Sequence, residues 1–207
     1  AATEDSPGNF HSFGEESIPR IIKPLIAEAR KHADLIVFTP HWGFNWTENA
    51  SSERIRLAHA IIDLGVDAIV GHSAHQLHGI EIYKGRLIVY DMGSFFFDTV
   101  DKNRMRKSAA FVMTFSAGGF TKLNIYPLLL HPNCTVSAPE AQSVEIKNLI
   151  TRLSREIHPN IIFRDEGASL AVSFKPSEPA PARQYDPQKV HQTGRTRPLP
   201  QEMRKRK

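Results

Sequence analysis

Apolar residues in the first third of the chain follow two alternating spacings. In "SIPRIIKPLIAEARKHA" (17–33), isoleucines and leucines recur at the interval of one helix face, which predicts an amphipathic helix. The next run, "DLIVFTP" (34–40), is continuously apolar and β-branched, as is typical of a strand buried on both faces. The same order returns as a helix in "SERIRLAHAIIDLG" (52–65) and a short strand in "VDAIVG" (66–71).

The pattern changes in the second third of the chain. "GIEIYKG" and "RLIVYDMG" alternate as two strands joined by a turn at Lys84-Gly85. "AAFVMTFSAGGFTKLNIYPLLL" (109–130) predicts a hairpin that turns at Gly118-Gly119. Helices that alternate with strands, followed by hairpins, predict an α/β fold whose sheet becomes antiparallel later in the chain.

The last structured element and the tail complete this outline. "SAPEAQSVEIKNLITRLSREIH" (137–158) predicts a helix that starts with a capping box of Ser137 and Glu140. From about residue 172 the chain is rich in proline and charge and poor in aromatic residues, which predicts a disordered tail. We therefore expect one domain over residues 1–160 and an extension with a basic, Pro-rich tail over residues 161–207.

Charge is distributed unevenly between this tail and the rest of the chain. The net charge of the 207 residues is +4, but residues 182–207 alone hold eight Lys and Arg against two acidic residues. The body is therefore slightly acidic, and we expect no specific nucleic-acid partner. Cys134 is the single cysteine, so an internal disulfide is excluded. No apolar run approaches the ~20 residues of a transmembrane helix.

Three histidines follow the first two predicted strands. His41 comes directly after the strand at 34–40, and His72 and His75 come directly after the strand at 66–71. Functional groups of α/β folds gather at the carboxyl ends of strands, and imidazole is the commonest ligand of transition metals. The pattern favours a metal site. A loop histidine is also often a surface or hydrogen-bonding residue, and the spacing alone leaves both readings open.

Three ordered segments resemble the C-terminal half of the CapA family, which acts in capsule and poly-γ-glutamate synthesis. They are "HWG" at 41–43, "GHSAHQLHGIEIYKGRLIVYDMGSFFFD" at 71–98 and "LLLHPN" at 128–133. The family has a calcineurin-like metallophosphatase fold. The resemblance therefore implies the C-terminal part of a four-layer metallophosphatase-like β-sandwich flanked by helices, with a phosphoesterase-like hydrolase site.

The resemblance also implies a site. It makes His41, His72 and His75 ligands of divalent cations of the manganese, zinc or iron class, with two cations in the full-length protein and weak binding by this chain alone. Four further residues would orient these ligands or contact the substrate: Asp91, Asp98, Ser94 and Gln76. The implied partners are a polyanionic polymer or phosphoester substrate and membrane-associated polymer-synthesis proteins, at the cell envelope.

The chain departs from the family pattern at several positions. Asn45 stands where the family usually has Glu, Ser73 where it has His, and Ser94 where it has Asn. The Gly-Asp strand end and Asn-Asn-His motif of the family's N-terminal half do not occur, and the sequence starts without Met. We therefore expect a portion of a longer protein. The alternatives to a hydrolase are a non-enzymatic, polymer-binding or scaffold component and a truncated product that does neither.

Overall fold

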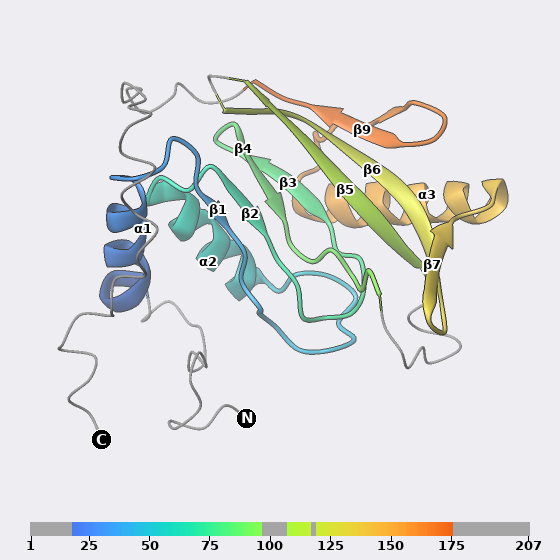
Figure 1. The fold of residues 1–207 in the computed structure, drawn as a ribbon, viewed down its shortest axis with the longest axis horizontal. Coiled ribbons are helices and arrows are strands. Elements are labelled where there is room, and N and C mark those ends of the chain that lie inside the picture. The colour runs from blue at the N-terminus through green and yellow to red at the C-terminus, as the bar shows by residue number, and fades with distance from the viewer. Residues whose placement is uncertain (1–17, 97–106, 117–118, 176–207) are drawn as a thin grey trace.

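The computed structural model describes residues 18–96, 107–116 and 119–175. It shows a mixed α/β fold with two β-sheets (Figure 1). This confirms the expected fold class. Of the sequence predictions, the tail beyond residue 175 and the Gly118 end of the hairpin turn lie outside the described residues.

The first sheet has four strands in the order β1-β2-β4-β3. Their bounds are β1 Val37–Phe38, β2 Ala68–Val70, β3 Ile80–Tyr83 and β4 Arg86–Val89. β1, β2 and β4 are parallel, and β3 is antiparallel to β4. The turn between β3 and β4 has positive φ at Lys84 (50°) and Gly85 (70°), which is the two-residue hairpin geometry that the sequence predicted.

Helices cover one face of this sheet. They are a π-helical turn at Ile18–Ile22, α1 at Lys23–Ala29 and α2 at Ser52–Asp63. The core between helices and sheet joins Ile22, Ile61, Ile69, Ile88 and Tyr90. α2 starts at the predicted position because the Ser51 side chain accepts a hydrogen bond from the backbone N–H of Arg54, a standard N-cap.

The second sheet packs on the other face of the first (Figure 1). It consists of β5 Lys107–Ser116, β6 Gly119–His131, β7 Cys134–Ser137, β8 Arg164–Asp165 and β9 Leu170–Ser173. The strand order is β5-β6-β9-β8, with β7 also paired to β6, and every pair is antiparallel. α3, Glu140–Ile157, contacts both β3 and β6 and contributes Ile146 and Ile150 to the core between the sheets.

Three local predictions were wrong. The helix expected over 17–33 contains a π-helical turn, and its α-helical part ends at Ala29. The strand expected over 34–40 pairs only at Val37–Phe38. The predicted capping box does not form, because Ser137 pairs with Leu128 as the last residue of β7 and α3 begins at Glu140 without a side-chain cap.

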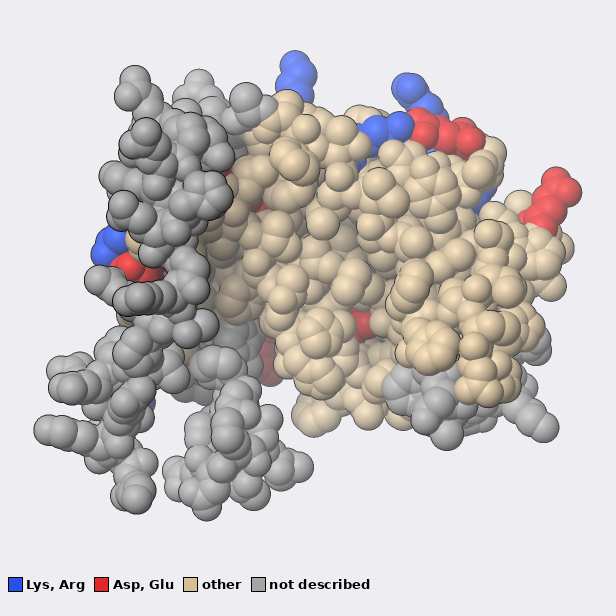
Figure 2. Space-filling model, viewed as in Figure 1, with Lys and Arg blue, Asp and Glu red and all other residues tan. Residues whose placement is uncertain are grey.

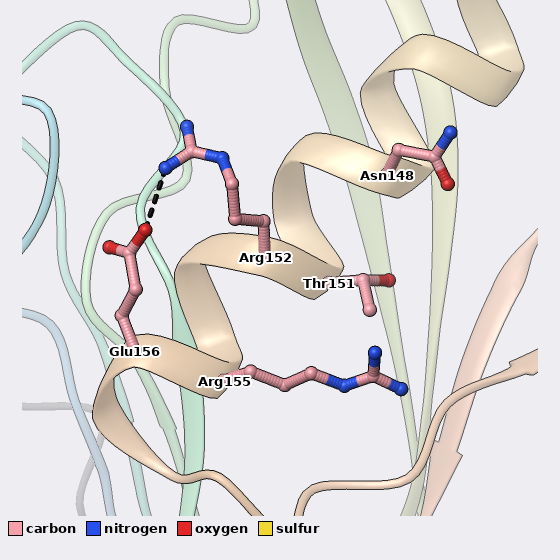
Figure 3. Close-up of a pocket in the computed structure, with 5 residues that line it drawn as sticks. All are labelled: Asn148, Thr151, Arg152, Arg155 and Glu156. Carbon is pink, nitrogen blue, oxygen red and sulfur yellow. Dashed lines mark hydrogen bonds and ion pairs between the residues drawn. The ribbon is translucent and has the colours of Figure 1, made fainter.

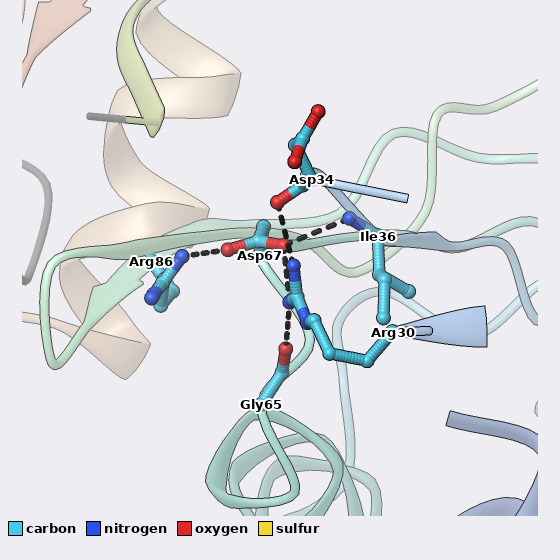
Figure 4. Close-up of polar contacts among 6 residues, drawn as sticks. All are labelled: Arg30, Asp34, Ile36, Gly65, Asp67 and Arg86. Atoms are coloured by element: carbon cyan, nitrogen blue, oxygen red, sulfur yellow. Dashed lines mark hydrogen bonds and ion pairs between the residues drawn. The ribbon is translucent and has the colours of Figure 1, made fainter. Parts of the chain in front are cut away.

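A buried carboxylate fixes the amino ends of the parallel strands (Figure 4). Asp67, which is 4% exposed, lies just before β2. Its carboxylate accepts hydrogen bonds from Arg30 Nη2 (2.6 Å), from the backbone N–H of Ile36 (2.8 Å) and from Arg86 Nη1. Arg30 also donates to the carbonyl of Gly65. These contacts connect the starts of β1, β2 and β4, and so align the opposite ends of the same strands.

Within the ranges that the structure describes, no helix is both long and apolar enough to cross a membrane.

Candidate functional site

The carboxyl ends of β1 and β2 bring two of the predicted histidines together. His41 and His72 form a parallel β-bridge, in which Trp42 N–H donates to the carbonyl of His72 (2.9 Å) and His72 N–H to that of Pro40 (3.1 Å). The two Nδ1 atoms lie 3.1 Å apart, and the ring centroids 4.9 Å apart. We call this end of the sheet, defined by His41 and His72, the histidine edge.

The Nδ1 pair suits two kinds of contact. One neutral imidazole can donate to the other, and two imidazoles can also bind one cation. With first-row metal–nitrogen bonds of ~2.0–2.1 Å in a tetrahedral site, the two nitrogens would lie about 3.3 Å apart. Burial, and then the neighbouring His41, lower the pKa of His72, so the neutral form that coordinates metals is favoured. His41 is exposed at the surface, so the pair is accessible from solvent.

His75 lies in a different set of contacts. Its backbone has φ of 59°, its Nδ1 lies 3.0 Å from Ser94 Oγ, and its ring stacks on Trp46 at a centroid distance of 5.4 Å. No group of three or more His, Cys, Asp or Glu side chains is arranged to hold a metal ion in the part of the chain that the structure describes. The described donor set therefore fits two ligands of a cation, and the roles of all three histidines stay predictions.

Asp91 is buried beneath the loop that carries His72 and His75. Its carboxylate accepts hydrogen bonds from the backbone N–H groups of Ala74 (2.7 Å) and Gly93 (2.9 Å). Burial raises the pKa of Asp91 to about 6, against the opposing effect of these hydrogen bonds and of the Arg54 charge. Both oxygens are thus used to shape two turns.

Three other residues were predicted to orient ligands or contact the substrate. Ser94 is buried and contacts His75 as described, and Gln76 is half-buried in the same loop. Asp98 lies outside the described residues. Their expected part in orienting ligands or substrate stays a prediction.

Arg54 is the residue that the sequence reasoning missed. It is 7% exposed, and its guanidinium carbon lies 5.9 Å from the centre of the Trp42 ring. Trp42 is itself buried and donates from Nε1 to the carbonyl of Tyr90 (2.9 Å). Positions 54, 57, 58 and 61 share one helix face, so the apolar periodicity of α2 already placed this arginine toward the core.

A second polar network lies between α2 and the β3–β4 hairpin. His59 Nε2 is 2.9 Å from both oxygens of the buried Glu81, and Tyr90 Oη donates to Glu81 at 2.7 Å. Burial, followed by the Glu81 charge, raises the pKa of Tyr90, which keeps the phenol protonated as a donor. This network links a helix to the sheet and gives His59 a structural role.

A shallow hollow of about 490 Å³ lies on α3 (Figure 3). Its lining comes from one helix: Asn148, Thr151, Arg152, Arg155 and Glu156. Arg152 is paired with Glu156 at 2.6 Å. On the face drawn in Figure 2, the described surface is mostly uncharged, and its Lys and Arg side chains are few and scattered. No broad cationic surface appears on that face.

Comparisons with known proteins agree with the resemblance. The profile of the bacterial capsule synthesis protein family, PGA_cap, matches residues 4–99. The "PGA biosynthesis protein CapA" of Bacillus subtilis is 32% identical over 178 residues, which are 86% of this chain and 44% of that protein.

Two more relatives extend the comparison. The "Capsule biosynthesis protein CapA" of Bacillus anthracis is 32% identical over 127 residues, 61% of this chain and 30% of that protein. A "Probable polyglutamine synthesis accessory protein" of Mycobacterium tuberculosis is 25% identical over 179 residues, 80% of this chain and 46% of that protein. The chain thus spans less than half the length of these relatives. On this evidence, the chain belongs to the CapA family of bacterial capsule synthesis proteins.

Proposed function

We propose that this chain acts in the synthesis of a bacterial capsule polymer of the poly-γ-glutamate type, through a metal-dependent hydrolase site at the histidine edge. The observation that carries the hydrolase part is the 3.1 Å approach of His41 Nδ1 and His72 Nδ1 at the carboxyl ends of two parallel strands. The family and the printed names of the relatives support the part in polymer synthesis.

Each residue has a proposed task. His41 and His72 present neutral nitrogens to one divalent cation of the manganese, zinc or iron class. His75 is the proposed third ligand: the contact between its Nδ1 and Ser94 Oγ would orient the ring, as in many metal sites whose ligand histidines are held through the other nitrogen. A bound cation supplies Lewis-acid activation of the bond to be hydrolysed.

The donor set of the described residues is incomplete, because three neutral imidazoles bring no negative charge to balance a second cation. We propose that carboxylate ligands and a second cation belong to the full-length protein, and that this chain alone binds metal weakly. The proposed substrate is a phosphoester or the polyanionic polymer itself. Association with membrane-bound synthesis proteins at the cell envelope is part of the same proposal.

The second candidate function is a non-enzymatic, polymer-binding or scaffold role. Two observations favour it: the lack of a three-residue metal group among the described residues, and Ser73 and Asn45 at positions where the family usually has His and Glu. In this case the histidine pair would be a hydrogen bond that joins two loops, without affinity for a cation.

Calorimetric titration of the 207-residue chain with zinc or manganese separates the two candidates. We expect weak binding of one cation, lost in His72→Ala and kept in His32→Ala, which changes an exposed histidine three residues after α1. Binding that is absent, or equal in both variants, would favour the scaffold role.

An assay of the same protein with a generic phosphodiester tests whether its set of metal ligands is incomplete. We expect no turnover. Robust metal-dependent turnover that is lost in His75→Ala would show that the chain is complete and would overturn the proposal that further ligands are needed.

A further inference from the structure

Arg54 reaches from α2 to Trp42 and Gly43 in the loop after β1. Its guanidinium occupies the space beside Gly43 so closely that a Cβ at Gly43 would lie 1.4 Å from Nη2. Gly43 also has φ of 86°, so the backbone there suits glycine for a second reason. The loop after β1 therefore follows a path that depends on the arginine beneath it.

The arginine is buried with part of its hydrogen-bonding capacity unused. Arg54 Nη1 has no hydrogen-bond partner among the described residues. A buried guanidinium is costly unless its donors are satisfied, so an arginine kept in this position needs an acceptor nearby.

His78 supplies the complementary group. Its Nε2 lies 2.8 Å from the carbonyl of Thr47, and because a carbonyl can only accept, Nε2 carries the proton. His78 Nδ1 is therefore an acceptor, and it is the other buried side-chain atom without a partner in the described part of the chain. Burial lowers the pKa of His78 to about 4, and the Arg54 charge acts in the same direction.

Asp91 is the third group that Arg54 faces. The charges of the two residues attract, although no hydrogen bond joins them directly. Through its backbone contacts at Ala74 and Gly93, Asp91 shapes the turn between His72 and His75 and the turn before Ser94. Arg54 thus contacts the loop after β1 at Trp42 and Gly43 and faces the carboxylate that shapes the loop after β2.

We propose that Arg54 is a positioning residue, which donates to His78 Nδ1 through a water and, together with Asp91, holds the loops that make His41 and His72 face each other. This inference deepens the proposed function and rests on it only where zinc binding is the readout. Its geometrical part, the approach of the two rings, stands without a metal.

The test compares Arg54→Met with Arg56→Met, which changes an exposed arginine two residues along the same helix. In metal-free protein, we expect the nuclear Overhauser contact between the His41 and His72 rings to vanish in Arg54→Met and to persist in Arg56→Met. Zinc affinity should fall about 10- to 100-fold in Arg54→Met, the range typical for residues that orient ligands. Unchanged ring contact together with cooperative unfolding would overturn the proposal.

Arg54→Lys keeps the test valid where Arg54→Met does not fold. Lysine keeps the charge that faces Asp91 and loses the planar guanidinium group beside Trp42 and Gly43. We expect a weakened ring contact at unchanged secondary structure, and full retention of the contact would contradict a positioning role. If the parent chain binds no zinc while the ring contact still depends on Arg54, the proposed function fails and the positioning role stands.

Discussion

The two ends of the first sheet differ in how well their buried polar groups are hydrogen-bonded. At the amino ends, both Asp67 oxygens accept hydrogen bonds from arginines. At the carboxyl ends, Arg54 and His78 each leave a buried nitrogen without a partner among the described residues. Three of the five non-glycine residues with positive φ in the described chain also lie there: Trp46, Ser73 and His75.

This difference separates stability from function. Unsatisfied polar groups and strained backbone cost free energy and tend to gather at functional sites, where the rest of the fold compensates for them. The amino end therefore aligns the strands, and the carboxyl end carries the loops whose geometry the proposed chemistry needs. The comparison predicts that the same kind of substitution will change stability at one end and ligand binding at the other.

The largest expected effect is at the amino end. Asp67→Ala leaves Arg30 and Arg86 partly buried without their acceptor, and breaking a buried ion pair in this way costs about 3–5 kcal/mol. Denaturant unfolding measures the loss. Asp63→Ala, which removes an exposed partner of Lys84, is the matched control and should change stability little. Equal effects of both variants would remove the contrast between the two ends.

At the carboxyl ends of the strands, two buried groups make stability depend on pH. Asp91 has a folded pKa of about 6, above its ordinary 3.8, so its contribution to stability is lost as pH rises from about 4 through 6. His78 has a folded pKa of about 4, below its ordinary 6.5, so its contribution is lost as pH falls through the same window. The two slopes oppose each other in the parent protein.

The Asp91→Asn variant should show the pH dependence of stability that comes from His78 alone. We expect the free energy of unfolding of this variant to rise more steeply between pH 4 and 6 than that of the parent. Denaturant unfolding at a series of pH values provides the measurement. A slope equal to that of the parent would mean that Asp91 does not titrate in this range.

The smallest effect expected is that of Ser94→Ala. Removing the hydroxyl frees His75 Nδ1 from its contact and should cost about 1 kcal/mol of stability, the usual worth of one hydrogen bond. If His75 is the third ligand, zinc affinity should also fall about 10-fold, because a ligand ring loses its orientation. Loss of stability without any change in affinity would leave His75 a structural residue.

Local rules predicted much of the fold. Lys84-Gly85 specified a hairpin, and the continuous apolar runs before His41 and His72 indicated neighbouring strands. β2 is buried as expected, whereas Val37 of β1 is exposed. The rules failed where tertiary pairing prevailed: Ser137 became part of β7, and β8 and β9 were not predicted.

The candidate site shows the same limit. Sequence position placed His41 and His72 at one edge, because the ends of adjacent parallel strands must meet. It could not predict that His75 would turn toward Ser94 and Trp46, since a left-handed backbone at a non-glycine residue is decided by the surrounding contacts. Arg54 was visible on the apolar face of α2, but only the fold shows what lies above it.

The central claim is that His41 and His72 form a metal-binding pair. Long-range proton–nitrogen spectra of the imidazole rings, recorded during zinc titration of the 207-residue chain, test it most directly. We predict that the Nδ1 signals of His41 and His72 shift together and reach their end point at one equivalent of zinc, while those of the exposed His32 do not move. Nδ1 signals of the pair that stay in place while zinc is added would contradict the account.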